Sequence, residues 1–335
     1  MLLTVCTIAQ LPDALTLGSS FRQHHPDESF IIGLADDATR LPAGFQCPYP
    51  LLTALESMPG DLGVLSARYT PTEFTAAGKP SFIRAAFARF PNEPYLLYAD
   101  PETFVYRPLT SVYARLDSAT ALLTPHITRP PSDANWPDEK AMQNVGLYSA
   151  GFLAFRSGAE TDRLLAWWED RVTGRAFIDA CEGLCTDQLW LMHWPAFFDG
   201  IQIVKDPGWQ VALWNLPERR LTLSAERRDG TTADWLVNGS TPLVFANFRG
   251  LTNPDAGFFP HQTRFRTGDR ADVLKLLANY QRSLHLHEQP TLRAMTPTFG
   301  NKPEPVVLRG WRQTMATAAR QLTTFIDKVP LPVFR

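Results

Sequence analysis

Two carboxylates one residue apart stand at the end of a short apolar run. Asp100 and Glu102 follow the run Tyr95–Ala99, which prolines bound on both sides. Such a run is typical of a buried strand that opens into a turn, and ligands bind at the carboxyl ends of strands in open α/β sheets. Because Mg²⁺ and Mn²⁺ take oxygen ligands from one or two carboxylates and the rest from phosphates and water, the pair predicts a cation held against a diphosphate. The alternative is an ordinary Asp-Pro-Glu turn.

The composition argues against several classes of protein. The chain has 335 residues and a formal net charge of −2, so nothing global indicates nucleic-acid binding. No apolar run reaches the length of a membrane span, and the first residues lack the basic start of a secretion signal. Cys6, Cys47, Cys181 and Cys185 have no partners nearby that would complete a zinc site, so we expect free thiols in a reducing cytosol. These features predict a cytoplasmic enzyme.

The first part of the chain alternates between strand and helix patterns. Strand patterns cover residues 2–8, 30–34, 66–69, 95–99 and 121–126, and helix patterns cover residues 14–24 and 72–90. This alternation favours an α/β fold with a mostly parallel sheet.

The end of the chain has a different pattern. Residues 270–287 predict a helix, and residues 306–325 carry apolar side chains at near-helical spacing, with Arg309, Arg312 and Arg320 supplying positive charge. A basic amphipathic helix can lie on an anionic membrane, which predicts peripheral contact with the inner membrane face. The alternative is a helix that packs on the domain.

A set of short motifs occurs in one order along the chain. In order they are Thr7-Ile8-Ala9, Lys79-Pro80, Tyr98-Ala99-Asp100-Pro101-Glu102, Thr124-Pro125-His126, Gly151-Phe152, Trp167-Trp168, Asp187-Gln188-Leu189-Trp190, Asp206-Pro207-Gly208 and Ala212-Leu213-Trp214-Asn215-Leu216. In this order they resemble bacterial GT-A glycosyltransferases related to glycosyltransferase family eight, over about residues 2–265.

The resemblance implies a fold and an activity. The fold is GT-A, a Rossmann-like, mostly parallel mixed sheet flanked by helices, in a catalytic domain of residues 1–265 that a helical extension of residues 266–335 follows. The activity is transfer of a hexose from a nucleotide sugar, a UDP-sugar, to a saccharide, glycan or protein acceptor, with retention and with Mn²⁺ or Mg²⁺.

By the resemblance, the acidic pair belongs to a metal and diphosphate site. Asp100 and Glu102 match the DxD motif, and Asn247 stands where the relatives carry a metal-binding histidine in Phe-x-His-Phe-Ser-Gly. Asparagine is a weaker ligand than imidazole for Mn²⁺. Arg249 replaces the serine of that segment and can hold a diphosphate directly. These departures predict weaker metal binding than in the relatives, with the diphosphate site kept.

Five further positions are expected around the donor. The resemblance places Thr7 and Ala9 along the nucleotide, and Asp36 at its base or ribose. Lys79 falls at a basic position of the relatives, which implies a contact with a phosphate or the donor sugar, and Arg84 is a rival for that task. The alternative for Lys79 is a lysine on a helix surface.

The segment that begins at Thr186 carries the expected catalytic pair. Asp187 and Gln188 match the family's Asp-Gln motif, which faces the reacting sugar. Asp187 would stabilise an oxocarbenium-like centre or hold the acceptor hydroxyl. Its alternative role is a helix N-cap, because apolar residues follow it.

Two other functions stay open at this point. A catalytically degenerate relative that only binds nucleotide or glycan is suggested by Glu102 and Asn247. A glycoside hydrolase is disfavoured, because carboxylates at positions i and i+2 of a strand end are unsuited to flank a glycosidic bond.

Overall fold

The computed structural model describes residues 1–179, 181–224 and 234–328. The chain forms two compact units, Met1–Pro303 and Glu304–Arg335. This division differs from the predicted boundary after residue 265, because the segment after that residue packs into the first unit. Within the described residues, no helix is both long and apolar enough to cross a membrane.

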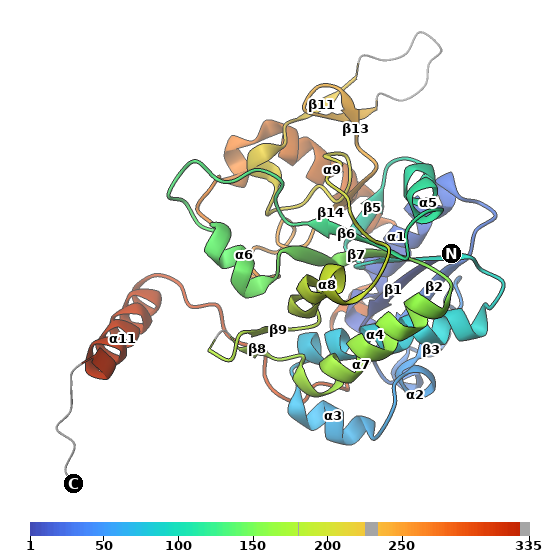
Figure 1. The fold of residues 1–335 in the computed structure, drawn as a ribbon, viewed down its shortest axis with the longest axis horizontal. Helices are drawn as coiled ribbons and strands as arrows, with labels where there is room; N and C mark the ends of the chain where they lie inside the picture. Colours follow the sequence, from blue (N-terminus) through green and yellow to red (C-terminus); the bar gives the residue numbers. More distant parts are fainter. Residues whose placement is uncertain (180, 225–233, 329–335) are drawn as a thin grey trace. The chain divides into compact units, whose positions relative to one another are not determined.

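A seven-stranded sheet forms the centre of the first unit (Figure 1). Its strands in chain order are β1 Leu2–Cys6, β2 Phe30–Leu34, β3 Leu51–Thr53, β4 Tyr95–Ala99, β6 Ala121–Pro125, β7 Tyr148–Arg156 and β10 Ile201–Ile203. The spatial order is β10-β6-β7-β4-β1-β2-β3, and only β7 runs antiparallel to its neighbours. The predicted α/β class with a mostly parallel mixed sheet is therefore confirmed.

The direction of β7 decides what meets at the functional edge of the sheet. The other six strands end at one edge, whereas β7 begins there with Tyr148. The backbone N–H of Asp100, directly after β4, donates to the carbonyl of Gly151 at 2.9 Å. The carboxyl ends of β1, β2, β4 and β6 thus lie at the same edge of the sheet as the first residues of β7.

Helices cover both faces of the sheet. The helices of the first unit are α1 Leu11–His24, α2 Ala54–Ser57, α3 Leu62–Arg68, α4 Pro71–Arg89, α5 Thr110–Leu116, α6 Glu139–Val145, α7 Ala159–Arg175, α8 Trp194–Phe197, α9 Ala271–His285 and α10 Pro290–Arg293, with short 3₁₀ helices η1 Ile8–Gln10, η2 Ala38–Arg40, η3 Leu189–His193, η4 Leu216–Glu218 and η5 Thr267–Asp269. The second unit contains α11 Trp311–Lys328. The predicted helices at residues 14–24, 72–90 and 270–287 are confirmed.

The strand predicted at residues 66–69 is wrong. The chain there is the end of α3. Its start is capped by Asp61, whose carboxylate accepts the N–H groups of Gly63 and Val64. A cap of this kind satisfies helix donors, and four residues of apolar alternation are too few to compete with it.

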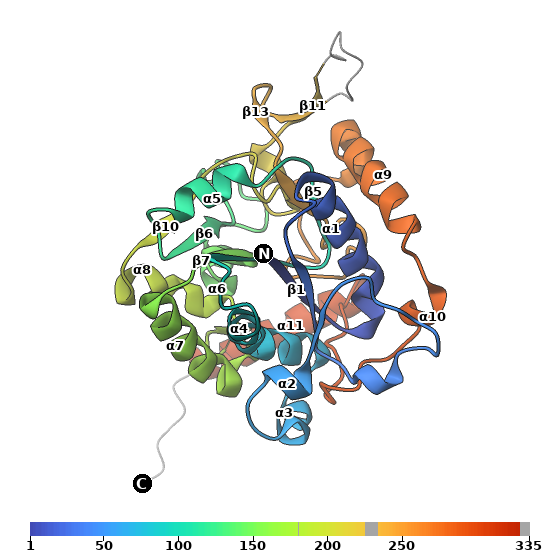
Figure 2. The same ribbon diagram turned by 90° about the vertical axis from the view of Figure 1, so that its right-hand side faces the viewer.

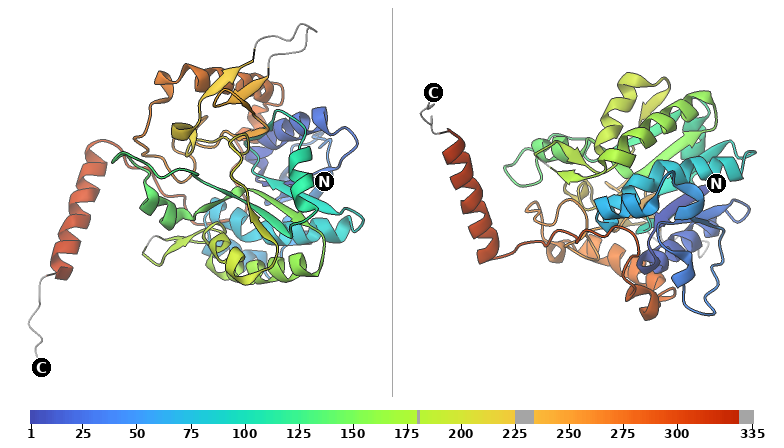
Figure 3. Two further views of the ribbon diagram at one scale, coloured as in Figure 1. Left: turned by 45° about the horizontal axis from the view of Figure 1, so that its top comes forward. Right: turned by 90° about the horizontal axis from the view of Figure 1, so that it is seen from below.

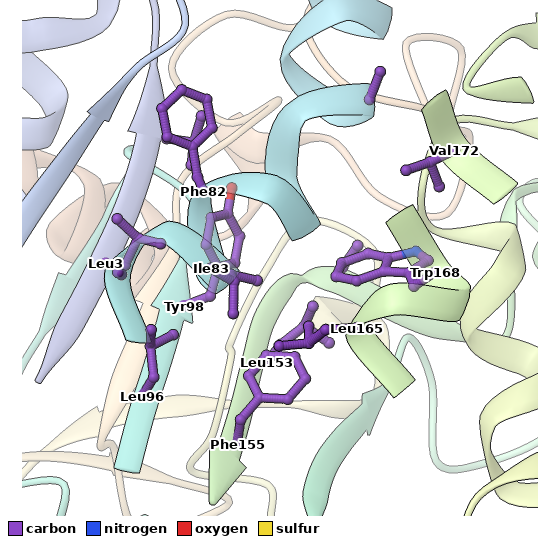
Figure 4. Packing of buried hydrophobic residues seen from close by; sticks show 14 of the residues in the cluster. Leu3, Phe82, Ile83, Leu96, Tyr98, Leu153, Phe155, Leu165, Trp168 and Val172 are labelled. Carbon is purple, nitrogen blue, oxygen red and sulfur yellow. The ribbon is translucent and has the colours of Figure 1, made fainter. Parts of the chain in front are cut away.

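Two apolar layers hold the helices on the sheet. On one face α4 and α7 pack together, and Figure 4 shows Phe82 and Ile83 of α4 in one buried cluster with Leu96 of β4 and Trp168 of α7. On the other face α1 and α5 cover strand residues such as Leu97. Strands buried on both faces are expected in parallel sheets.

Helix α9 belongs to the first unit because it packs beside α1, as Figure 2 shows. Tyr280 of α9 donates from its hydroxyl to Asp13 of α1 at 3.1 Å. In the second unit α11, coloured red in Figure 3, is one unbroken helix.

Three small sheets complete the structure. They pair β5 Thr103–Val105 with β14 Phe245–Asn247, β8 Ile178–Asp179 with β9 Leu184–Cys185, and β11 Leu221–Leu223 with β12 Trp235–Val237 and β13 Thr241–Pro242. The β5–β14 pair is antiparallel and places Asn247 opposite Thr103. Through this pairing, residues distant in sequence reach the acidic pair. All four cysteines are free thiols.

Candidate active site

A cavity of about 160 Å³ lies at the carboxyl edge of the central sheet. Its lining comes from the ends of β1 and β4, the start of β7, helix α4, and the segments around Asp187 and Arg249. Of the predicted site residues, seven line it: Thr7, Lys79, Asp100, Glu102, Asp187, Gln188 and Arg249. The fold therefore brings together residues spread over 240 positions of sequence.

Asp100 stands between two cations at the end of β4. One carboxylate oxygen, Oδ1, accepts the hydroxyl of Tyr98 at 2.9 Å and lies 4.0 Å from Nζ of Lys79. The other, Oδ2, lies 4.0 Å from a guanidinium nitrogen of Arg249. Burial and the neighbouring Asp100 raise the pKa of the Tyr98 phenol, so this hydroxyl stays a donor. Asp100 is thus held by charge and by one hydrogen bond, with lone pairs left for a ligand.

Lys79 is a buried lysine rather than a surface one. Its side chain is 7% exposed, and Nζ lies 2.6 Å from Oδ2 of Asp187 and donates to the carbonyl of Ala150 at 3.0 Å. The alternative of a surface lysine is therefore wrong. The residue after it, Pro80, lies inside α4 and has no N–H, so the carbonyl of Ala76 in the cavity wall loses its usual helical partner.

A hydrogen bond from the buried core holds the backbone of Asp187. Its backbone carbonyl accepts the indole N–H of Trp168 at 3.1 Å, and the side chain is almost fully buried. The preceding residue, Thr186, has φ 51°, a left-handed conformation that is rare for β-branched residues and that clusters at functional sites. The carboxylate pairs with Lys79 instead of capping a helix, so the N-cap alternative does not describe this residue.

Gln188 uses its amide to hold the backbone. Its Oε1 accepts the N–H of Ala150 at 3.1 Å and its Nε2 donates to the carbonyl of Val145 at 2.6 Å. Both ends of the amide are therefore engaged. Gln188 also lines the cavity. It holds the backbone of Ala150 in β7, whose carbonyl accepts a hydrogen bond from Lys79.

Glu102 and Arg249 form the opposite side of the cavity. Burial raises the pKa of the Glu102 carboxyl to about 7, although Arg249 acts in the other direction. Burial would lower the pKa of the Arg249 guanidinium, but Glu102 and Asp100 outweigh it and raise that pKa. The two residues approach through the β5–β14 pairing, because Phe248 N–H donates to the carbonyl of Glu102 at 2.9 Å.

Four predicted site residues lie outside the cavity lining, namely the metal ligand Asn247 and the donor contacts Ala9, Arg84 and Asp36. Asn247 is fully buried behind it. Ala9 turns its carbonyl to Arg293, which donates at 3.2 Å. Arg84 points away and pairs with Glu169 of α7, so of the two rivals on α4 only Lys79 reaches the site.

Asp36 lies outside the lining because its carboxylate is already used. It accepts the backbone N–H groups of Ile8 at 3.2 Å, Asp37 at 2.9 Å and Thr298 at 2.9 Å. Thr298 belongs to a segment after α10 that crosses this edge of the sheet, and its neighbour Pro297 lines the cavity. The Asp36 carboxylate therefore holds this segment in place, and its oxygens do not line the cavity.

Sequence reasoning missed several lining residues. Gln10, Thr72, Phe258 and Pro297 come from four separate segments, and no local pattern connects them. A signal did exist at Gly151, which the motif Gly151-Phe152 contains. A Cβ there would lie 2.8 Å from Oδ2 of Asp100 and 3.1 Å from Nδ2 of Asn247, so only glycine keeps this space open.

The residues present do not fit a divalent cation held by three protein ligands. Across the described ranges, no group of three or more His, Cys, Asp or Glu side chains is placed to hold a metal. Asn247 turns its amide nitrogen toward Gly151 and keeps its oxygen on the N–H of Arg249 at 2.9 Å. Nitrogen of a primary amide is a donor and not a cation ligand. The cation implied by the resemblance stays a prediction.

Comparisons with known proteins give distant matches. No protein-family model matches the chain. The uncharacterized protein YfnF of Bacillus subtilis (strain 168) is 24% identical over 250 residues, covering 74% of this chain and 80% of YfnF. The uncharacterized protein YfnD of the same strain is 23% identical over 203 residues, covering 60% of this chain and 61% of YfnD.

Solved structures of glycosyltransferases resemble the chain in fold. The galactosyltransferase LgtC in complex with donor and acceptor sugar analogs matches with 12% identity and a TM-score of 0.44, covering 85% of this chain and 95% of that chain. A glycosyltransferase involved in glycosylation of the major capsid of PBCV-1 matches with 11% identity and a TM-score of 0.40, covering 65% and 87%. Because both scores lie below 0.5, the function argued next rests on the residues of the site.

Proposed function

We propose that this protein is a glycosyltransferase of the GT-A type that moves a hexose from a nucleotide sugar, a UDP-sugar, to a saccharide, glycan or protein acceptor, with retention. One observation carries the proposal. Lys79, Asp100, Asp187 and Arg249 converge on one cavity at the carboxyl edge of the sheet. Such an edge is where ligands bind in open α/β folds, and the same four residues belong to the ordered motifs and the segment after them.

The two sides of the cavity suit the two ends of a nucleotide sugar. On the Lys79 side, the Asp187 carboxylate is placed to stabilise positive charge that develops at an anomeric carbon. On the other side, Arg249 presents a guanidinium, which binds phosphate through paired hydrogen bonds. Thr7, between β1 and η1, also lines the cavity.

A panel of nucleotide sugars tests this proposal by thermal shift, because a ligand that binds the folded state raises its melting temperature. We expect a UDP-sugar to give the largest shift, and slow hydrolysis of that sugar by the protein. Asp187→Asn should keep the shift and lose most of the hydrolysis. If no nucleotide sugar gives a shift or is hydrolysed, with or without Mn²⁺, the proposal fails.

The same measurements separate an enzyme from a binding protein. The engaged amide of Gln188 and the half-buried Glu102 leave few free catalytic groups, which is the observation that favours a degenerate relative. UDP binding in calorimetry without hydrolysis, and without transfer to any acceptor tested, would establish that alternative.

We also propose that the protein is cytoplasmic and that α11 contacts the inner face of the membrane. It exposes Trp311, Met315, Leu322 and Phe325, and Arg312 adds positive charge. Apolar area together with basic residues is the combination that binds anionic lipid surfaces. The free thiols agree with a reducing compartment.

Vesicle sedimentation tests this contact. We expect the protein to sediment with vesicles that contain anionic phosphatidylglycerol and to stay in the supernatant with neutral phosphatidylcholine. The double variant Trp311→Ser and Phe325→Ser should release it from the anionic vesicles. Equal sedimentation of wild type and variant would contradict the proposal.

A further inference from the structure

The wall formed by β14 and the residues after it presents hydrogen-bond donors. Asn247 is fully buried, and its Oδ1 accepts the backbone N–H of Arg249 at 2.9 Å. The backbone N–H of Arg249 needs an acceptor, so the atom of the Asn247 amide that faces it is the oxygen. The amide nitrogen, Nδ2, therefore points away from Arg249 N–H. That Nδ2 has no hydrogen-bond partner among the described residues and lies beside Gly151, behind the cavity lining. An amide that turns its N–H groups to this side offers no oxygen to a cation at Asp100.

The guanidinium of Arg249 is the second donor group of this wall. Its side chain is 25% exposed and lines the cavity, with one nitrogen 4.0 Å from Oδ2 of Asp100. Within the described part of the chain, its guanidinium donates no hydrogen bond at normal distance. A guanidinium has five N–H donors in a planar fork that matches two phosphate oxygens.

A cation bound at Asp100 would meet these groups unfavourably. The space beside Oδ2 is bordered by the Asn247 amide nitrogen, and Arg249 and Lys79 each stand 4.0 Å from one oxygen of Asp100. A cation bound to either oxygen of Asp100 would therefore lie close to a like charge, and like charges at such distances repel by several kcal/mol at the effective dielectric near a protein surface. Positive charge and N–H donors thus border the place where a bridging metal would bind.

We propose that the donor's diphosphate binds directly to Arg249, with no divalent cation between protein and phosphate. This inference rests on the proposed glycosyltransferase function and specifies how that site takes a nucleoside diphosphate. Asp100 then holds Arg249 and Lys79 on two sides of the cavity by charge. Lys79 stays with Asp187 and Ala150, on the sugar side.

Calorimetric titration of the full chain with UDP and with inorganic pyrophosphate, in EDTA and in Mn²⁺, tests the inference. We expect binding in EDTA, and a change in dissociation constant below about threefold on adding Mn²⁺, since a shift of that size is under 1 kcal/mol. Titration of Mn²⁺ alone into the protein should give no binding heat.

Two variants with matched controls sharpen the test. Arg249→Gln should weaken UDP binding in EDTA by about 10- to 100-fold, the usual value of a hydrogen bond to a charged group. Arg84→Gln makes the same chemical change outside the cavity and should leave binding unchanged. Asn247→Asp, of equal size, replaces the amide nitrogen by a carboxylate oxygen, whose negative charge should weaken UDP binding in EDTA, and Mn²⁺ should restore that binding. Manganese paramagnetic resonance should then detect bound Mn²⁺ in this variant alone.

The outcomes separate the inference from the function it rests on. UDP binding by the wild type that requires Mn²⁺ overturns the inference and leaves the glycosyltransferase proposal intact. Binding in EDTA that Arg249→Gln does not weaken also overturns it, provided that circular dichroism shows the variant folded. Absence of UDP and pyrophosphate binding in both buffers overturns the inference, and absence of any shift in the nucleotide-sugar panel overturns the proposed function with it.

Discussion

The ends of β2 and β4 look alike in sequence and differ in space. Each strand is a buried apolar run followed within two residues by an aspartate, Asp36 or Asp100. The Asp36 carboxylate accepts three backbone N–H groups and lies outside the cavity. The Asp100 carboxylate accepts one hydroxyl, lines the cavity and has a cation 4.0 Å from each oxygen. The first arrangement fixes the chain, and the second leaves lone pairs and charge for a ligand.

The largest expected difference between the two strand ends is in activity. Asp100→Asn keeps the size of the side chain but removes the charge that holds Lys79 and Arg249 in place. We expect nucleotide-sugar turnover to fall by about 100- to 1,000-fold, the usual cost of losing one group of a preorganised electrostatic site. Steady-state kinetics with the best donor of the panel measures this, and a loss below about threefold would remove Asp100 from the site.

The end of β6 extends the comparison to a group that titrates. Burial lowers the pKa of His126 to about 4, below the 6.5 of an exposed histidine. The unfolded chain therefore takes up a proton at higher pH than the folded one, so stability is complete above pH 6.5 and falls as the pH drops toward 4. The shift corresponds to about 3 kcal/mol.

Urea unfolding between pH 4 and pH 7 measures that loss. His126→Gln should flatten the dependence of the unfolding free energy on pH in this window, because glutamine does not titrate. At pH 7 the wild-type histidine is neutral. The difference in unfolding free energy between variant and wild type at this pH therefore measures the effect of the substitution apart from titration. An equal slope in wild type and variant would assign the pH dependence to other groups.

At the end of β2 we expect an effect on stability without one on ligand binding. Asp36→Ala leaves buried N–H groups of Ile8 and Thr298 without acceptors, which costs about 2 kcal/mol of unfolding free energy. UDP affinity, corrected for the folded fraction, should change little. If Asp36→Ala instead abolishes nucleotide binding in a folded protein, Asp36 contacts the base or ribose and the segment at Thr298 has to move.

Arg84 gives the smallest expected effect. Its side chain is 48% exposed and pairs with Glu169, and exposed ion pairs contribute about 0–1 kcal/mol. Arg84→Ala should leave turnover and UDP affinity unchanged, whereas Lys79→Ala should reduce turnover strongly. Parallel kinetics on the two variants check this, and equal losses would contradict the assignment of Lys79 alone to the site.

Much of the site follows from the sequence because local patterns set it. The strand Tyr95–Ala99 and the helix Pro71–Arg89 are where the patterns place them, so Lys79 and Asp100 had to lie near one sheet edge. Helix geometry also indicates that only one of Lys79 and Arg84 can reach the cavity. Five residues turn a helix by about 140° beyond one full turn, so the two side chains cannot face the same cavity.

Other features depend on contacts that no local pattern encodes. The oxygens of Asp36 are occupied by an N–H from Thr298, 262 residues later. The orientation of the Asn247 amide depends on the backbone N–H of Arg249 and on the β5–β14 pairing. The packing of α9 on the first unit depends on contacts such as that of Tyr280 with Asp13 of α1.

The sequence by itself determined the α/β alternation, the acidic pair at the end of β4 and most of the charged residues that line the cavity. These depend on periodicity and residue type, which act over one strand or one turn of helix. Only the tertiary structure decided which aspartate is free and which is saturated, and that a buried amide nitrogen faces the space beside Asp100. Hydrogen-bond partners from distant segments settle those questions, because a carboxylate or an amide is available to a ligand only when the fold has not already used it.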